Sequence, residues 1–166
     1  MENKTGLKGV IAGIVTVSDS CAQGKRRDES GPVLETLLVR VGASLIDRQI
    51  VSDDEAAIAR AVKRQIRLKA DVVLTTGGTG LGPRDVTPEA TRLVLQKEIP
   101  GLSEAMRSAG SQKTRRAFLS RGVCGVRGKS LIINLPGSPK GAAESWEAIV
   151  DLIPHALAMI RGEGHS

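Results

Sequence analysis

The sequence predicts an α/β fold in which a mostly parallel sheet lies between two layers of helices, a three-layer α/β/α sandwich. Short apolar, β-branched segments alternate with amphipathic segments of helical length along the whole chain. This alternation favours parallel strands connected by helices that cover both faces of the sheet. The 166 residues contain no linker or internal repeat and are enough for one well-buried core, so one domain is predicted over residues 1–166.

The N-terminal segments predict a central strand followed by a helix. Val10–Val17 is apolar and β-branched, as expected of a strand buried on both faces. The polar residues after it are expected to form a mobile loop in which Asp28 and Glu29 are solvated. Ser30 is predicted to cap a helix that ends at Gly42, because serine is a preferred N-cap and glycine a preferred terminator.

A second strand is predicted at Ser44–Val51 and a third at Asp71–Thr76. Between them, Ser52–Glu55 has the form of a capping box. The helix that follows carries lysines and arginines on one face, which is typical of a solvent-facing side. Its opposite face carries apolar residues spaced four apart: Ile58, Val62 and Ile66.

The C-terminal half continues the alternation. Thr87 is predicted to cap a helix, and residues 102–108 are expected to be helical. Val123–Arg127 and Ser130–Leu135 are expected to pair as a hairpin across a glycine-containing turn. The last helix should kink or split at Pro154, which lacks the N–H group that the preceding turn requires.

Composition and charge limit the classes of function. The chain is 40% hydrophobic and 25% charged, as in ordinary globular proteins, with a net charge of +6 and a pI near 9.7. A basic RNA-binding module is disfavoured because one Phe, one Trp and no Tyr leave almost no stacking surface, and no nucleic-acid-binding motif is present. The charge indicates either a solvated basic surface or a field that attracts small polyanions such as nucleotides.

Other features argue against metal-thiolate, zinc and membrane proteins. Cys21 and Cys124 are far apart and are expected to be free thiols. His155 is expected to be exposed and His165 lies in the C-terminal tail, so no zinc site is predicted. The sequence has no apolar run of membrane-spanning length, and we expect a cytoplasmic protein with no membrane or nucleic-acid partner.

Three predicted strands end in small or hydroxyl residues at Ser18–Ser20, Thr76–Gly80 and Asn134–Ser138. Parallel sheets bind ligands beyond the carboxyl ends of their strands, so these segments are candidates for one cleft. The middle segment belongs to a glycine-rich run that could direct backbone N–H groups at a phosphate. That run matches neither a Walker A loop nor the dinucleotide pattern GxGxxG, so another geometry is needed.

Two aspartates near these loops have alternative explanations. Asp85 follows the glycines and adjoins Arg84, so a local turn role and a functional role are equally compatible with its position. Asp53 is expected in the first turn of a helix. The helix dipole favours an acid there by about 0.3–1 kcal/mol, so its presence needs no functional explanation.

Leu74–Gly80 followed by Pro83–Thr91 resembles the signature of the molybdopterin adenylyltransferases, which include bacterial Mog proteins and the gephyrin G domain. The resemblance spans nearly the whole chain. It recurs in several shorter segments: Thr16–Ser20, Asp28 with Ser30 and Gly31, Leu119–Arg121, Gly125–Lys129 and Leu131–Ser138.

The resemblance implies a single molybdopterin-binding domain that forms a homotrimer. It implies transfer of AMP from Mg-ATP to molybdopterin, giving adenylylated molybdopterin and pyrophosphate for molybdenum cofactor biosynthesis. A molybdate-inserting enzyme would be the partner that receives the product. Because such transfer depends mainly on positioning and charge stabilisation, a site without His or Cys is chemically sufficient.

The functional aspartates of the family fall on Asp53 and Asp85, which we expect to hold Mg²⁺ and the ATP phosphates. The family's substrate-binding elements fall on twelve further residues: Ser18, Asp19, Ser30, Thr76, Gly77, Gly78, Thr79, Gly80, Asn134, Pro136, Gly137 and Ser138. We expect the N–H groups of the glycine run to hold the pterin phosphate.

The chain departs from the family pattern at Ser52, where proline is usual, and in the basic stretch Gln112–Arg116. The alternative to an enzyme is a non-catalytic molybdopterin-binding or scaffold paralogue of the same fold. The intact Arg84–Pro88 run, together with Asp53, favours catalysis.

Overall fold

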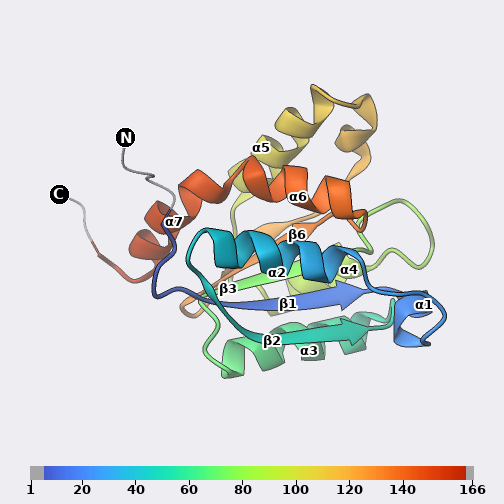
Figure 1. Cartoon of the computed structure of the whole chain (residues 1–166), viewed down its shortest axis with the longest axis horizontal. Helices are drawn as coiled ribbons and strands as arrows, with labels where there is room; N and C mark the ends of the chain where they lie inside the picture. Colours follow the sequence, from blue (N-terminus) through green and yellow to red (C-terminus); the bar gives the residue numbers. More distant parts are fainter. Residues whose placement is uncertain (1–5, 164–166) are drawn as a thin grey trace.

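Six strands form one sheet in the order β2-β1-β3-β6-β5-β4 (Figure 1). The structure is a computed structural model that describes residues 6–163. The first four strands of that order run parallel, and the last two are antiparallel to their neighbours. The strands are β1 (Ile11–Val17), β2 (Ser44–Val51), β3 (Val72–Thr76), β4 (Lys97–Glu98), β5 (Cys124–Arg127) and β6 (Ser130–Leu135).

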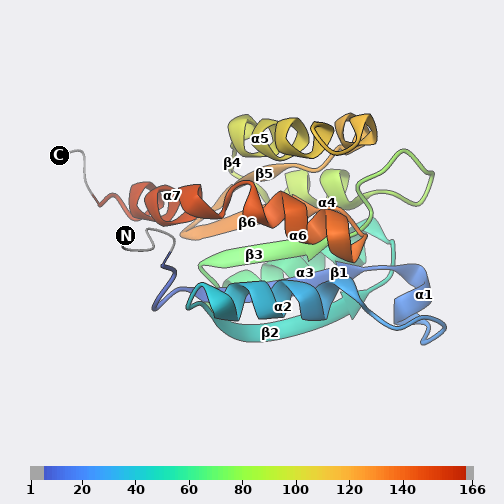
Figure 2. The same ribbon diagram turned by 45° about the horizontal axis from the view of Figure 1, so that its top comes forward.

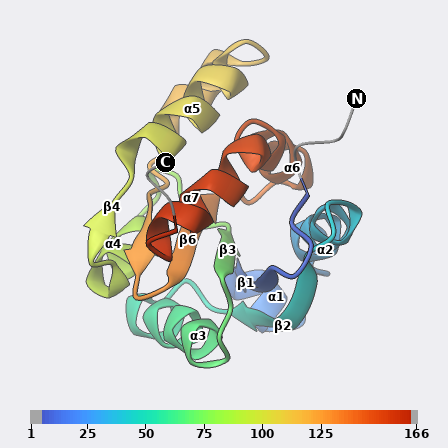
Figure 3. The ribbon, with the colours of Figure 1, turned by 90° about the vertical axis from the view of Figure 1, so that its left-hand side faces the viewer.

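Helices cover both faces of this sheet, which confirms the predicted α/β fold with a mostly parallel sheet. α2, α5, α6 and α7 lie on one face and α3 and α4 on the other (Figure 2, Figure 3). The helical segments are α1 (Asp19–Ala22), α2 (Ser30–Arg40), α3 (Glu55–Arg67), α4 (Thr87–Val94), α5 (Pro100–Ser111), η1 (Arg115–Leu119), α6 (Pro139–Glu147), η2 (Val150–Leu152) and α7 (Ile153–Ile160).

The alternation of side chains along β1 and β3 creates a hydrophobic layer on each side of the sheet. Ile14 and Leu74 face the α2 and α6 side, where Trp146 is buried with 1% exposure. Val15 and Val73 face α3 and α4. Every residue of β3 is buried, because successive strand residues point to opposite faces and both faces are covered.

The loop before α2 is tied to the sheet more closely than the sequence predicted. Asp28 is half-buried, not solvated: its carboxylate accepts hydrogen bonds from the Thr16 hydroxyl at 2.9 Å and from the Gly31 N–H at 3.0 Å. Ser30 is the first residue of α2 and makes no capping bond. The Asp28 carboxylate instead accepts from a backbone N–H group in the first turn of the helix. Glu29 is exposed, as predicted.

The starts of two other helices, α3 and α4, also differ from the prediction. The differences change where Asp53 and Thr87 lie relative to these helices. Asp54, not Ser52, caps α3 by accepting from the Ala57 N–H at 2.8 Å. Asp53 therefore precedes the helix, and the expectation that it lies in the first helical turn is wrong. Thr87 is the first residue of α4, and its hydroxyl donates to the Gly77 carbonyl at 2.9 Å.

Apart from the start of α4, the predictions for the C-terminal half are confirmed. β5 and β6 pair as the expected hairpin, with Arg127 opposite Ser130. The last helical region divides into η2 and α7, and Pro154 lies in the first turn of α7. His155 is exposed.

Both cysteines are free thiols, as predicted, and burial raises the pKa of Cys124 to about 11. His165 lies outside the described residues. Within residues 6–163, no helix has the length and apolar character needed to cross a bilayer.

Candidate functional site

The carboxyl ends of β1, β3 and β6 lie side by side at one rim of the sheet, because these strands are parallel neighbours. Side chains and backbone groups join the loops that follow them. The Thr76 hydroxyl donates to the Pro136 carbonyl at 2.7 Å, and the Gly77 N–H donates to the Leu135 carbonyl at 3.1 Å. The structure therefore brings together the strand ends that the sequence singled out.

A cavity of about 390 Å³ opens at this rim, and we call it the rim cavity. Its walls come from the loop before α2 and the first residue of that helix, from the segment before α3, from the glycine run and from the loop before α6. Nine predicted site residues line it: Ser18, Ser30, Asp53, Thr76, Gly77, Gly78, Asp85, Gly137 and Ser138. The remaining predicted residues, Asp19, Thr79, Gly80, Asn134 and Pro136, lie outside its lining.

Asp19 lies beside the rim cavity and orients Asp53. The Asp53 N–H donates to the Asp19 carboxylate, and the Asp19 N–H donates to the Asp53 carboxylate, both at 2.9 Å. Arg84 donates two hydrogen bonds of 3.0 Å to the two oxygens of Asp19. Those bonds hold the pKa of the Asp19 carboxyl below its usual range. Asp19 is thus an ionised carboxylate, paired with Arg84, that positions Asp53.

Burial raises the pKa of Asp53 above the ordinary aspartate value. The negative charges of Asp19 and Asp85 act in the same direction, although the hydrogen bond from the Asp19 N–H opposes them. An ionised Asp53 is therefore held where anionic charge accumulates. A cation at this position would relieve that unfavourable environment.

The two cavity aspartates suit a magnesium ion. One oxygen of Asp53 accepts from the Asp19 N–H, and one oxygen of Asp85 accepts from the Gly82 N–H at 2.8 Å. Each carboxylate keeps its second oxygen available. Among the described residues no group of three or more His, Cys, Asp or Glu side chains could hold a metal ion by itself. Mg²⁺ characteristically uses one or two carboxylates together with substrate phosphates, so the pair fits.

The glycine run is close to other backbone segments. Gly77 has φ +101° and Gly78 has φ +66°, conformations that favour glycine. A side chain at Gly77 would collide with the Val17 carbonyl oxygen, and one at Gly78 would collide with the Thr87 hydroxyl. A Cβ at Gly137 would lie 3.2 Å from the Gly77 Cα. The glycine run therefore packs tightly against the end of β1, and the loop at Gly137 packs closely against the glycine run.

Only part of the glycine run can bind a phosphate through its backbone. The Gly77 N–H is already bonded to the Leu135 carbonyl. The N–H groups of Gly78, Thr79 and Gly80 donate to no other group in the described chain. Of these three residues only Gly78 lines the rim cavity, and phosphate binding by the glycine run stays a prediction.

Arg121 holds the loop that carries Asp85. Its guanidinium donates to the carbonyls of Gly80 at 2.8 Å and Asp85 at 2.7 Å and forms an ion pair with Glu89. Its own N–H donates to the Thr79 carbonyl at 2.9 Å. The site prediction did not include Arg121. Only the family resemblance around Leu119–Arg121 could have signalled it.

Asn134 has an internal role. Its side chain is 2% exposed, accepts from the Val123 N–H at 3.1 Å and donates to the hydroxyls of Thr75 and Thr91 at 2.9 and 3.0 Å. These bonds connect β6 with β3 and α4. The amide therefore has structural hydrogen bonds at the base of the loop, and its expected contact with a substrate stays a prediction.

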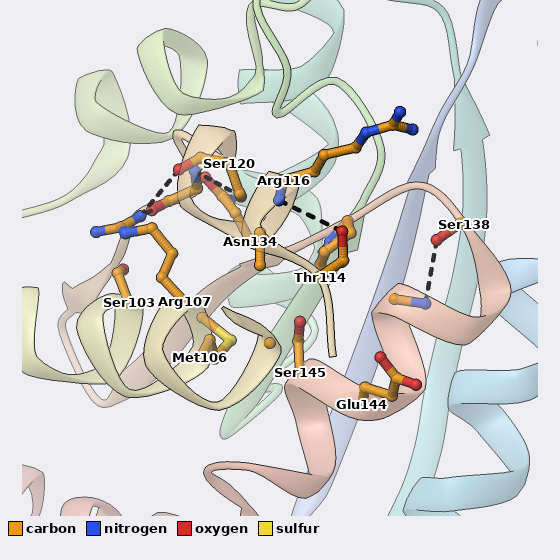
Figure 4. A pocket seen from close by; sticks show the side chains of 15 residues that line it. Ser103, Met106, Arg107, Thr114, Arg116, Ser120, Asn134, Ser138, Glu144 and Ser145 are labelled. Atoms are coloured by element: carbon orange, nitrogen blue, oxygen red, sulfur yellow. Dashed lines mark hydrogen bonds between the residues drawn. The ribbon is translucent and has the colours of Figure 1, made fainter. Parts of the chain in front are cut away.

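A second cavity of about 250 Å³, the side cavity, lies between α5, η1 and α6 (Figure 4). It shares one lining residue, Ser138, with the rim cavity. Asn134 and Pro136 contribute to its lining. Arg107 lines it and donates to the carbonyls of Ser120 and Gly122. Thr114 and Arg116 also line it, which places part of the basic stretch Gln112–Arg116 beside this cavity.

A family model described as a probable molybdopterin binding domain matches residues 13–155. The chain belongs to this molybdopterin-binding domain family. The family assignment confirms the resemblance inferred from the Leu74–Gly80 and Pro83–Thr91 segments.

Two relatives illustrate how far this similarity extends. The crystal structure of the molybdopterin biosynthesis enzyme MoaB from Thermus thermophilus is 46% identical, with a TM-score of 0.87, covering 95% of this chain and 99% of that one. A protein named molybdopterin adenylyltransferase from Helicobacter pylori strain J99 is 39% identical over 159 residues, 94% of this chain and 90% of the relative.

Other members of the molybdopterin-binding domain family are much longer. The cinnamon protein of Drosophila melanogaster, named a molybdenum cofactor synthesis protein, is 43% identical over 156 residues, which are 93% of this chain but 26% of the relative. The matches to two proteins named molybdenum cofactor biosynthesis bifunctional protein, from Synechococcus elongatus and Chlorobaculum tepidum, cover 50% and 55% of their lengths. The chain thus spans between a quarter and about half of these relatives.

Proposed function

We propose that this molybdopterin-binding domain is a molybdopterin adenylyltransferase that transfers AMP from ATP to the terminal phosphate of molybdopterin. The observation that carries the proposal is the rim cavity, where Asp53 and Asp85 lie beside loops with free N–H groups. The side cavity supports it, because it shares Ser138 with the rim cavity and offers space for part of a second substrate. The Helicobacter relative bears the name of this activity.

In the proposed reaction an oxygen of the molybdopterin phosphate attacks the α-phosphorus of ATP. The bond between that phosphorus and the bridging oxygen breaks, and pyrophosphate leaves with the electron pair. The attacking phosphate is already ionised, so no side chain has to accept a proton. The protein must hold two anionic substrates in line and offset their repulsion.

The site residues suit this task. When bound, Mg²⁺ would supply positive charge to the phosphate oxygens, and Asp53 and Asp85 are the groups that would hold it. Arg84 orients Asp19, and Asp19 in turn fixes the Asp53 backbone. The N–H group of Gly78 is available to a phosphate in the rim cavity, and Ser138 lines both cavities.

The proposal includes a homotrimer in the cytoplasm that passes its product to a molybdate-inserting enzyme. Large apolar side chains at the surface support an oligomer, since Leu93 is 64% exposed and Phe118 is 54% exposed. Free cysteines support a reducing compartment. Light scattering on the purified chain tests the trimer, and a monomeric mass at micromolar concentration would contradict it.

The decisive experiment incubates the protein with molybdopterin, ATP and Mg²⁺ and measures pyrophosphate release. Release should require all three components. Asp85→Asn should lower turnover by about 100-fold or more while molybdopterin still binds, because it removes a carboxylate charge from the reacting centre. Asp151→Asn, which changes an exposed aspartate in η2, is the matched control and should retain full turnover.

Two outcomes would contradict the proposal. Unchanged turnover in Asp85→Asn would remove the role assigned to that carboxylate. Tight binding of molybdopterin by the wild-type protein without pyrophosphate release would favour the non-catalytic binding or scaffold paralogue.

A further inference from the structure

Arg26 and Arg27 are the only cationic side chains of the described chain that line the rim cavity. Both belong to the loop between α1 and α2 and are exposed. Neither forms an ion pair within the described residues. The other two arginines near the site are engaged: Arg84 binds Asp19, and Arg121 binds Glu89 and two carbonyls.

The backbone of this loop is fixed at both ends, so the two arginines are positioned over the cavity. On one side the N–H groups of Lys25 and Arg26 both donate to the Ser20 carbonyl, at 2.9 and 3.2 Å. On the other side the Asp28 carboxylate joins Thr16 of β1 to Gly31 of α2. The backbone of Arg26 and Arg27 is therefore held next to the rim cavity, while their side chains remain free to move.

The negative charges around the rim cavity would repel an anionic substrate unless cationic groups offset them. Four carboxylates line it, those of Asp28, Glu29, Asp53 and Asp85. A magnesium ion held by the last two would offset their charge but not the further negative charge of a nucleotide polyphosphate. Arginine suits such an anion, because its planar guanidinium can donate two parallel hydrogen bonds to phosphate oxygens.

We propose that Arg26 and Arg27 bind the polyphosphate chain of the nucleotide and hold the pyrophosphate that leaves. The inference rests on the proposed adenylyl transfer, and it identifies the part of the substrate that this loop recognises. Negative charge increases on the pyrophosphate as its bond to the α-phosphorus breaks. The two guanidinium groups stabilise that charge, while Asp53 and Asp85 line the same cavity.

Binding of inorganic tripolyphosphate, with Mg²⁺ present, tests the proposal without requiring turnover. Calorimetry compares the wild-type chain with Arg26→Ala/Arg27→Ala and with Arg26→Lys/Arg27→Lys. The matched control is Arg40→Ala/Arg67→Ala, which removes the same net charge from the distal ends of α2 and α3. At 1.5 Å per residue, these ends lie more than about 15 Å along the helices from the cavity.

We expect the alanine pair to weaken tripolyphosphate binding by at least about tenfold, equivalent to about 1.4 kcal/mol, with a smaller loss in the lysine pair. The control should bind within about twofold of the wild type, because distant surface charges are screened at physiological salt. In steady-state kinetics the alanine pair should raise KM for ATP and leave KM for molybdopterin unchanged.

Equal tripolyphosphate affinity in the alanine pair and the control would overturn the inference, as would a wild-type protein that does not bind tripolyphosphate. These results are separable from failure of the proposed function. A wild-type protein that binds tripolyphosphate through this pair but releases no pyrophosphate would refute adenylyl transfer and leave the polyphosphate site standing. Normal pyrophosphate release with no effect of the alanine pair on either measurement would refute the inference alone.

Discussion

Asp19 and Asp53 hold each other in place through reciprocal hydrogen bonds. Each carboxylate accepts from the backbone N–H of the other residue at 2.9 Å, and the residues lie 34 positions apart in the sequence. These two hydrogen bonds fix the segment after β1 against the segment after β2. It also directs Asp53 into the rim cavity, although two aspartates would otherwise repel each other. Arg84 offsets part of this repulsion, because its guanidinium forms an ion pair with Asp19.

The Asp19 carboxylate should therefore matter for turnover although it lies outside the cavity. Asp19→Asn keeps an acceptor for the Asp53 N–H but removes the charge that binds Arg84. We expect turnover to fall by about tenfold, because small displacements of positioned groups carry costs of this order. Pyrophosphate release at saturating substrates measures the change. Asp54→Asn is the matched control, since asparagine caps helices as well as aspartate. Equal turnover in the two variants would contradict the positioning role.

The raised pKa of Asp53 predicts that function and stability conflict at this residue. Because the folded protein retains this proton to a higher pH than the unfolded chain, the associated stability is present in acid and is lost as pH rises through the folded pKa. Asp53→Asn cannot ionise, so it should be more stable than the wild type at neutral pH, and the difference should shrink towards pH 4. Urea unfolding from pH 4 to 8 measures this difference, and pyrophosphate release should be lost. A variant that is less stable than the wild type at neutral pH would oppose this account.

The order of strands and helices and the convergence of three strand ends were predictable because they depend on local signals. Short, continuous runs of apolar and β-branched residues mark β1 and β3, and small residues mark where those strands end. The short elements α1 and β4 were not predicted. Four and two residues are too few to show a periodic pattern, and β4 is defined by its pairing with β5.

The contacts that arrange the site depend on residues distant in sequence, and local patterns do not reveal them. Asp53 was expected in a helix because Ser52–Glu55 resembles a capping box, but the helix begins two residues later than that pattern implies. Asp28 was expected in solvent because its neighbours are charged, whereas its partner Thr16 lies on β1. Arg121 contacts a loop about 40 positions earlier. Tertiary pairing determined all three outcomes.

The hydrogen bonds of Arg121 predict that this residue holds Asp85 in position. Arg121→Ala removes the bonds to the Gly80 and Asp85 carbonyls, so the loop should become more mobile and turnover should fall by about tenfold. Faster amide hydrogen exchange over residues 79–85 would distinguish loosening of the loop from a general loss of stability. Arg92→Ala, which removes an exposed pair with Glu98, is the control. If hydrogen exchange at 79–85 remained unchanged while turnover fell, the effect would have to be assigned to another contact.

Gly77 should be the glycine whose substitution is most damaging at the rim. Its φ of +101° disfavours any side chain, and a methyl group there would meet the Val17 carbonyl oxygen, which belongs to β1 and cannot move freely. Backbone strain and overpacking together should lower the free energy of unfolding of Gly77→Ala by roughly 2–4 kcal/mol. Chemical denaturation measures this loss.

Gly101→Ala provides the comparison for Gly77→Ala, because the two substitutions add the same methyl group in opposite surroundings. Gly101 lies in the first turn of α5, and a Cβ there meets nothing within 4 Å. Alanine should stabilise this helix by about 0.5 kcal/mol, since it restricts the unfolded chain more than glycine does. A Gly77→Ala protein as stable as Gly101→Ala would show that the glycine loop can rearrange, and the close approach of Gly77 to β1 would then not be required for folding.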